Sequence, residues 1–240
     1  FIWDALRGDL GDSTRLKSSV TSIIMQNIPF TASLAGGGLI FSLLIGLPLG
    51  TLGAIYRGTW IDSISMSFAL FGVSVPLFWF GLMLILFLAF RWPIFPATSN
   101  SMNIKALILH GVTLGFAQAD LFARLTRSAL LEIVNKDYIK TARSKGLWEL
   151  VVIGKHAMRN ALIPVVTIVG LQLGRMFTGA AVTETVFSRP GLGRLIVNAV
   201  KWKDFPLVQG AVLTASIIFL TMNLIVDLLY AYLDPRIRYD

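Results

Sequence analysis

Long apolar stretches dominate this chain and limit what it can fold into. Five of them cover residues 31–56, 63–90, 106–123, 164–182 and 208–233. A helix that crosses about 30 Å of hydrocarbon needs roughly 20 mostly apolar residues, which these stretches provide or approach. They lack the alternation of barrel strands, and lipid forces a chain to satisfy its own backbone hydrogen bonds. The sequence therefore predicts an all-α, polytopic membrane helix bundle with five transmembrane helices.

Composition supports the bilayer as the solvent. Hydrophobic residues make up 55% of the chain and charged residues 14%, which is more apolar than one soluble core requires. The net charge of +8 fits contacts with anionic lipid, and no basic-aromatic stripe indicates nucleic acid. The chain has no cysteine and two histidines, His110 and His156, so neither a metal site nor Ser-His catalysis is favoured.

Basic residues predict the orientation. Residues 124–163 hold eight lysines and arginines against three acidic residues, which favours the cytoplasmic side. The C-terminus is then cytoplasmic, and five spans leave residue 1 outside. We therefore expect one further transmembrane segment before Phe1, giving six in the full protein.

The segment before the first span has the pattern of an interfacial helix. Apolar residues recur near helical spacing over 14–28, with basic residues and serines between them. We expect Pro29 to break this helix before the chain enters the membrane. The three glycines at 36–38 are interpreted as ordinary close packing between membrane helices.

The basic loop carries the signature of a short surface helix. Asn135 or Asp137 is placed to cap its start, and Gly146 to end it in the left-handed conformation. A second short helix is expected from Leu147 until Pro164 begins the next span. One interpretation is a loop that only fixes topology against anionic lipid. A helix docked in a partner's groove also explains the small residue Ala142 and the regular apolar positions.

Charged residues inside the spans are candidates for function because charge is costly in hydrocarbon. Asp120 and Arg124 are four residues apart and are expected to pair on one helix face. Arg175 and Glu184 are nine apart, too far for direct pairing, and are candidates for the translocation pathway. A structural ion pair with a partner is the alternative for both. Asp227 is a candidate for the pathway, the inner gate or helix packing.

The basic loop resembles the EAA loop of binding-protein-dependent ABC importer permeases. Lys140, Thr141 and Ala142 stand where the family has Glu-Ala-Ala, and Gly146 stands at the family's glycine. The Glu and the first Ala are therefore absent. HAMRNALIP at 156–164 resembles the dipeptide, oligopeptide and nickel group. So do GDLGDS at 8–13, ETVFSRPGLGRL at 184–195, DFPLVQG at 204–210 and NLIVDLLYAYLDPRIRY at 223–239.

This resemblance implies an inner-membrane permease subunit with the type I ABC importer fold. It divides the chain into an extracytoplasmic segment, 1–30, and a permease domain, 31–240, with a coupling loop at 131–163. A second homologous permease, two ATP-binding subunits and an extracytoplasmic solute-binding protein are the implied partners, together with membrane lipid. The implied cargo is di- or oligopeptides, with nickel or another small solute as the alternative, and an ion-coupled carrier as a different class.

The resemblance also assigns roles to particular residues. Two sets are implied: ATPase-coupling residues Asp137, Tyr138, Thr141, Ala142, Arg143, Lys145 and Gly146, and outer-loop gate residues Arg189, Pro190, Gly191 and Gly193. The second set has an alternative interpretation as a tight loop. No phosphate-binding Gly-Lys-Ser/Thr motif occurs, because the only Gly-Lys pair, Gly154 and Lys155, is followed by His156. No catalytic residue or cofactor is thus expected here, with ATP and Mg bound by partner subunits of a bacterial-type plasma membrane complex.

Overall fold

The computed structural model describes residues 2–5, 7–98 and 103–233, and every regular element in these ranges is a helix. The elements are α1 (Ile2–Ala5), α2 (Val20–Ile55), α3 (Trp60–Ser74), α4 (Leu77–Leu84), η1 (Ile85–Arg91), α5 (Ile104–Ile133), α6 (Asp137–Ser144), α7 (Glu149–Val151), η2 (Val152–Ala157), α8 (Met158–Val186), α9 (Leu192–Trp202) and α10 (Phe205–Leu233). The two η elements are π-helical. The predicted all-α membrane bundle is confirmed.

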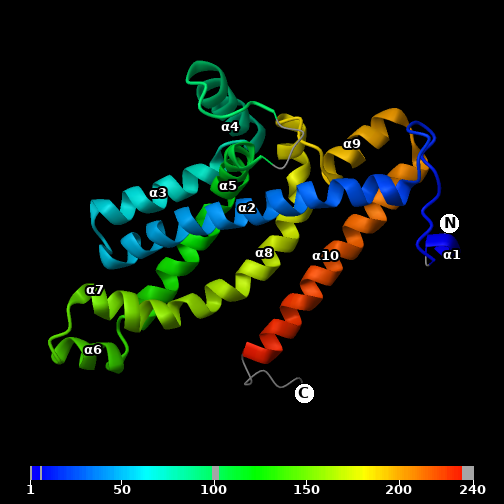
Figure 1. The fold of residues 1–240 in the computed structure, drawn as a ribbon. Coiled ribbons are helices and arrows are strands. Elements are labelled where there is room, and N and C mark those ends of the chain that lie inside the picture. The colour runs from blue at the N-terminus through cyan, green and yellow to red at the C-terminus, as the bar shows by residue number, and fades with distance from the viewer. Residues whose placement is uncertain (1, 6, 99–102, 234–240) are drawn as a thin grey trace.

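Helices α2 and α5 form the centre of the bundle and lie against each other along most of their length (Figure 1). Small residues recur every four positions on the facing sides, as Gly38, Ser42, Gly46 and Gly50 of α2 and Gly111, Gly115, Ala119 and Ala123 of α5. A Cβ on Gly50 would lie 2.4 Å from the backbone oxygen of Ala123. Membrane helices gain no hydrophobic energy by meeting each other, so such close backbone approach supplies the attraction.

The helix predicted over 14–28 begins later than expected, and Pro29 does not end it. Residues 14–19 form turns and a single isolated bridge residue, whereas α2 begins at Val20 and runs unbroken through Pro29 and Pro48 to Ile55. A proline removes only its own N–H from the helical ladder, and membrane helices tolerate this when neighbours stabilise them. Gly38 packs on Leu114, as expected for helix contact, while Gly36 has open space beside it.

The second predicted span is a bent pair of helices rather than one helix. Helix α3 ends at Ser74, and the chain then turns by 100° into α4 and η1. Pro76 causes the break because a residue before proline avoids helical dihedrals, and Val75 is extended with ψ of 130°. The described chain thus has four helices able to cross a membrane, or five if the bent pair counts as one span.

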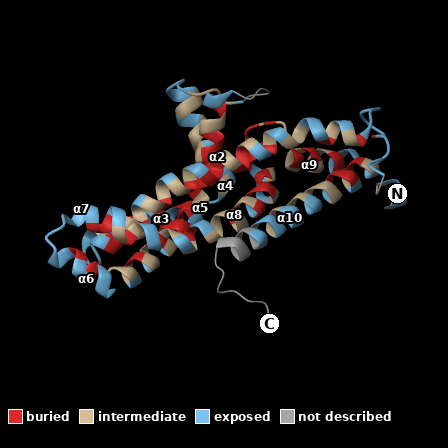
Figure 2. Ribbon diagram, turned by 60° about the horizontal axis from the view of Figure 1, so that its bottom comes forward, coloured by how far each residue is buried: buried red, intermediate tan, exposed pale blue. Residues whose placement is uncertain are grey.

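The helices of the basic loop differ in part from those predicted. Helix α6 is a separate short helix, but α7, η2 and α8 form one continuous helical rod through Pro164. The second surface helix ending at Pro164 is therefore a wrong prediction. Exposed residues concentrate on α6 and α7, at the opposite end from α9, and buried ones on the central helices (Figure 2). We call these the α6 end and the α9 end.

Candidate coupling surface and transport site

Helix α6 is held against the bundle by one apolar face. Ile139 is fully buried and Ala142 nearly so. They join a cluster with Leu130 of α5 and with Val152 and Ala157 of η2. Burying an isoleucine removes its side chain from water and contributes about 1.5–3 kcal/mol. This burial holds α6 on the helices under it.

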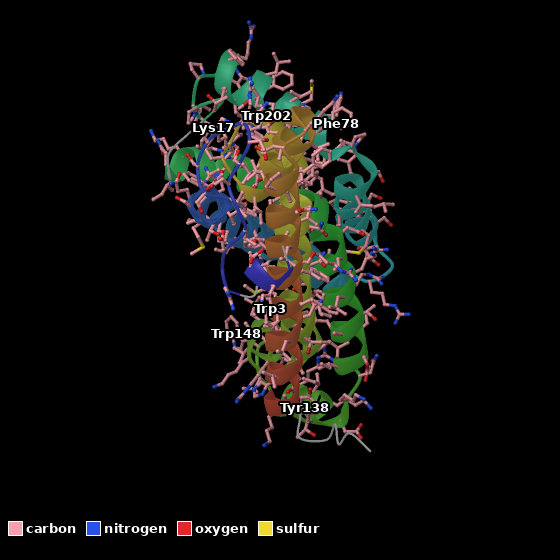
Figure 3. The ribbon with its side chains drawn as sticks, turned by 90° about the vertical axis from the view of Figure 1, so that its right-hand side faces the viewer. Trp3, Lys17, Phe78, Tyr138, Trp148 and Trp202 are labelled. Carbon is pink, nitrogen blue, oxygen red and sulfur yellow. The ribbon has the colours of Figure 1, made fainter. Side chains whose placement is uncertain are left out.

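The opposite face of α6 is exposed and polar. Among the predicted coupling residues, Asp137, Tyr138, Thr141, Arg143, Lys145 and Gly146 are exposed. Figure 3 places Tyr138 and Trp148 towards one end of the molecule, away from Lys17 and Trp202. The coupling role predicted for Ala142 is corrected, because its side chain is buried against the bundle and is not presented to a partner. Its small size instead lets α6 lie close to η2. We call the exposed face the α6 surface.

The predicted end of α6 is confirmed, but the predicted cap at its start is not. Gly146 has a φ of +76°, the left-handed conformation expected for the residue that ends the helix. The predicted cap is absent, because no side chain caps the helix start at Lys136. Asn135 donates to the Leu131 oxygen, and Asp137 pairs with Lys140 at 2.9 Å instead.

Two polar contacts fix the α6 surface to the following rod. The guanidinium of Arg143 donates to both carboxylate oxygens of Glu149, at 2.7 and 3.1 Å. This bidentate hydrogen bonding raises the pKa of Arg143, which stays charged. The Asn160 amide of α8 donates to the Tyr138 hydroxyl at 2.8 Å. Surface pairs contribute little energy, so their effect is to set orientation.

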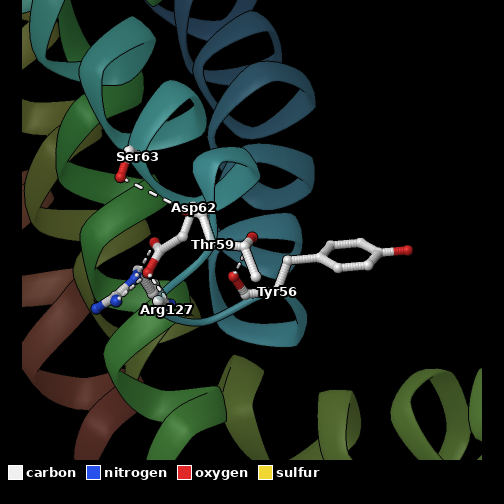
Figure 4. Close-up of polar contacts among 6 residues, drawn as sticks. Tyr56, Thr59, Asp62, Ser63 and Arg127 are labelled. Atoms are coloured by element: carbon white, nitrogen blue, oxygen red, sulfur yellow. Dashed lines mark hydrogen bonds and ion pairs between the residues drawn. The ribbon is translucent and has the colours of Figure 1, made fainter.

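A second ion pair lies where α2 turns into α3, and sequence reasoning missed it. Arg127 of α5 donates to both oxygens of Asp62, at 2.8 and 2.7 Å (Figure 4). Asp62 also accepts from the backbone N–H of Gly58 at 3.0 Å. The α2–α3 turn is thereby tied to α5 two turns before α5 reaches α6.

Glu184 does not fit the pathway role predicted for it. Its side chain is fully buried near the end of α8. One carboxylate oxygen accepts from the Thr31 hydroxyl at 2.5 Å, and the other accepts from the Arg194 N–H at 2.9 Å. Leu192 N–H in turn donates to Thr31 at 2.8 Å. The carboxylate therefore ties α2, α8 and the start of α9 together and cannot meet a cargo amine in this state.

The residues predicted for an outer gate pack around this buried cluster of hydrogen bonds. The Arg189 side chain is fully buried, donates to Ser33 at 3.0 Å and lies 5.4 Å over the Phe30 ring. A Cβ at Gly191 would lie 2.2 Å from the Glu184 carboxyl carbon, so only glycine admits the carboxylate. A Cβ at Gly193 would lie 2.5 Å from the Cα of Ala181. Together with Pro190 between them, these residues form a packed connection rather than an open loop.

A similar carboxylate joins the N-terminal segment to the α9–α10 turn. Asp204 accepts from the Ser13 hydroxyl at 2.5 Å, the Arg15 N–H at 3.1 Å and the Leu207 N–H at 3.3 Å. Burial alone would raise the pKa of Asp204, but these hydrogen bonds together hold it below its ordinary value. The structure thereby brings together GDLGDS and DFPLVQG, which are far apart in the sequence.

Arg175 is the predicted pathway residue that reaches open space. It is exposed and lines a cavity of about 770 Å³ between α8, α9 and α10. Asp120 instead pairs with Arg124 at 2.5 Å, as predicted. The side chain of Asp227 lies outside the described residues. His110 is fully buried and stacks edge-on with Phe187 at 4.3 Å. No three potential metal ligands gather anywhere in the described part of the chain.

Comparison with known proteins matches this architecture to one family. Residues 46–239 match the family described as binding-protein-dependent transport system inner membrane component. The match covers most of the chain. This protein is a member of that family.

Relatives and solved structures agree with the assignment. The chain is 37% identical to the dipeptide transport system permease protein DppB of Escherichia coli over 100% of its length and 79% of the relative's. It is 40% identical to the DppB protein of Alkalihalophilus pseudofirmus, over 100% and 80%. The methionine ABC transporter MetNI, in an inward-facing form, has a TM-score of 0.73 at 18% identity, over 88% of this chain and 96% of that one.

The crystal structure of an amino acid ABC transporter has a TM-score of 0.66 at 17% identity. The match covers 88% of this chain and 94% of that chain. These two structural likenesses establish the ABC importer permease fold. With its long apolar helices, the chain is a multi-pass membrane protein and a transport component of this family.

Proposed function

We propose that this permease imports short peptides as one subunit of an ATP-driven complex. The observation that carries the proposal is the identity of 37–40%, over the whole chain, to permeases named for dipeptide transport. A second homologous permease would complete the pathway, and an external solute-binding protein would deliver the cargo. The α6 end and the C-terminus would face the cytoplasm, and the α9 end the outside.

The ATPase activity would reside on two separate subunits that bind ATP and Mg. A conformational cycle needs a ligand that binds two states with different affinity, and nucleotide closing the ATP-binding subunits would supply it. The α6 surface is the proposed contact. Support comes from its packing. Ile139, on the buried face of α6, shares a cluster with Leu130 of α5 and with Val152 of η2, which continues into α8, so a displacement of α6 would act on two long helices.

Uptake of a short peptide into proteoliposomes that contain the four-subunit complex, with loaded binding protein added, tests the function. Accumulation should require hydrolysable ATP. Uptake that continues with ATP hydrolysis blocked and follows an ion gradient would instead identify a secondary carrier.

Gly146→Val tests the coupling surface separately. Valine at a φ of +76° is strained by roughly 1–2 kcal/mol, so the end of α6 should shift and ATPase association or coupling should weaken. Gly8→Val is the matched control, because Gly8 has a φ of +84° and equally open surroundings but lies in the segment before α2. Equal loss of coupling in both variants would contradict the role of α6.

A further inference from the structure

The cavity beside Arg175 has the composition of a ligand site. It is lined by the Arg175 side chain and by Gly179, Ile196, Val212, Ala215, Ser216, Phe219 and Leu220. Its volume of about 770 Å³ falls in the range of pockets that hold small ligands. Nearly all of its described lining is apolar, and Arg175 is the one charged residue among the described residues that line it.

Arg175 is without a counter-charge among the residues that the structure describes. It forms no hydrogen bond or ion pair there, whereas Arg124, Arg127 and Arg143 each pair with a carboxylate. A guanidinium keeps its charge in all protein environments, and the exposed Arg175 side chain presents that charge to the cavity. Glu184, the nearest acidic residue along α8, is fully buried and accepts hydrogen bonds from Thr31 and Arg194. The charge of Arg175 is therefore open to an anionic group that enters the cavity.

We propose that the C-terminal carboxylate of the transported peptide binds Arg175 while its last side chain occupies the apolar cavity. This rests on the proposed peptide import and adds a recognition residue to it. A planar guanidinium bonds a carboxylate through two parallel N–H donors. The Ser216 hydroxyl donates to the Val212 oxygen at 2.9 Å, which leaves its own oxygen free to accept from a peptide N–H. No acidic side chain is among the described residues that line the cavity, so the cavity favours the carboxylate end of a peptide over its ammonium end.

A cycle of two complexes and two peptides isolates the contact. Uptake of an apolar tripeptide and of its C-terminal amide is measured for the wild-type complex and for the Arg175→Gln complex, both with the same binding protein. The ratio of the two acid-to-amide ratios cancels the preference of the binding protein. We expect the acid-to-amide uptake ratio of Arg175→Gln to be roughly tenfold or more below that of the wild type, because a charged hydrogen bond is lost. Arg175→Lys should retain part of the wild-type ratio because it keeps the charge.

Blocking the cavity gives an independent readout. A Cβ added at Gly179 meets nothing within 4 Å, and Gly179 lines the cavity, so we expect the side chain of Gly179→Leu to occupy part of it. Gly36→Leu on α2 is the matched control, because Gly36 has equally open surroundings away from the cavity. Gly179→Leu should abolish most uptake of peptides with large last side chains while the complex still assembles.

Each other outcome overturns the inference. Loss of the second permease on purification of Arg175→Gln would show that Arg175 pairs with that subunit. An unchanged acid-to-amide ratio would show that Arg175 does not bind cargo, while ATP-driven peptide import would stand. Absence of any ATP-driven peptide uptake by the wild-type complex would remove the proposed function itself.

Discussion

Close packing of α2 on α5 predicts a large effect from one added methyl group at Gly50. The Cβ of alanine there would lie 2.4 Å from the Ala123 oxygen, where ordinary contact begins near 3.4 Å. The two helices must therefore separate by about 1 Å, and such overpacking costs about 1–3 kcal/mol. A gap of that size also forfeits a quarter to a half of each neighbouring van der Waals contact.

Gly36→Ala provides the comparison, because its methyl group meets open space on the same helix. Both substitutions gain the same roughly 0.5–1 kcal/mol from removing a glycine inside a helix. This gain cancels in the comparison, so the two alanine variants should differ by the overpacking cost of about 1–3 kcal/mol. Unfolding of the purified subunit by SDS in mixed micelles, followed by fluorescence of its six tryptophans, measures the difference. Equal midpoints for Gly50→Ala, Gly36→Ala and wild type would refute close backbone approach as the basis of this packing.

Three further predictions concern the polar contacts and the α6 surface. A double-mutant cycle of Asp62→Asn and Arg127→Gln should give a coupling of about 1 kcal/mol in the same unfolding assay, since the pair is bidentate but partly exposed. Because hydrogen bonds lower the pKa of Asp204, its stabilisation is present above about pH 4 and lost as the pH falls; Asp204→Asn should remove that part of the pH dependence of thermal unfolding. Ile139→Ala should reduce recovery of the ATP-binding subunits with the purified permease, whereas Lys201→Ala, at an exposed position of the α9 end, should not; equal recovery would contradict the packing argument.

The apolar stretches predicted the number and rough position of the spans because length and hydropathy are sufficient for that. They did not predict the shape of each span. Pro76 breaks the second span, yet Pro29 and Pro164 lie inside continuous helices. Whether a proline ends a helix depends on neighbours that stabilise its lost hydrogen bond, and sequence spacing does not show those neighbours.

The candidate site was predictable where local backbone chemistry decides it. Gly146 ends α6 in the left-handed conformation because only glycine adopts it at little cost. Glu184 was misjudged because its partner Thr31 lies 153 residues earlier in the chain. Asp62 and Arg127 are 65 residues apart and were missed for the same reason. Ala142 was assigned to the wrong face, since a small residue suits close packing inward as well as docking outward.

Transfer of motion through α6 is the central claim, and cross-linking tests it most directly because the chain contains no cysteine. Single variants Lys140→Cys on α6 and Lys201→Cys on α9 place one thiol at each end, both at exposed positions. In the assembled complex, a short bifunctional reagent should join Lys140→Cys to an ATP-binding subunit, with a yield that changes when nucleotide binds, and should leave Lys201→Cys unlinked to it. Linkage of the ATP-binding subunit to Lys201→Cys alone would contradict the account.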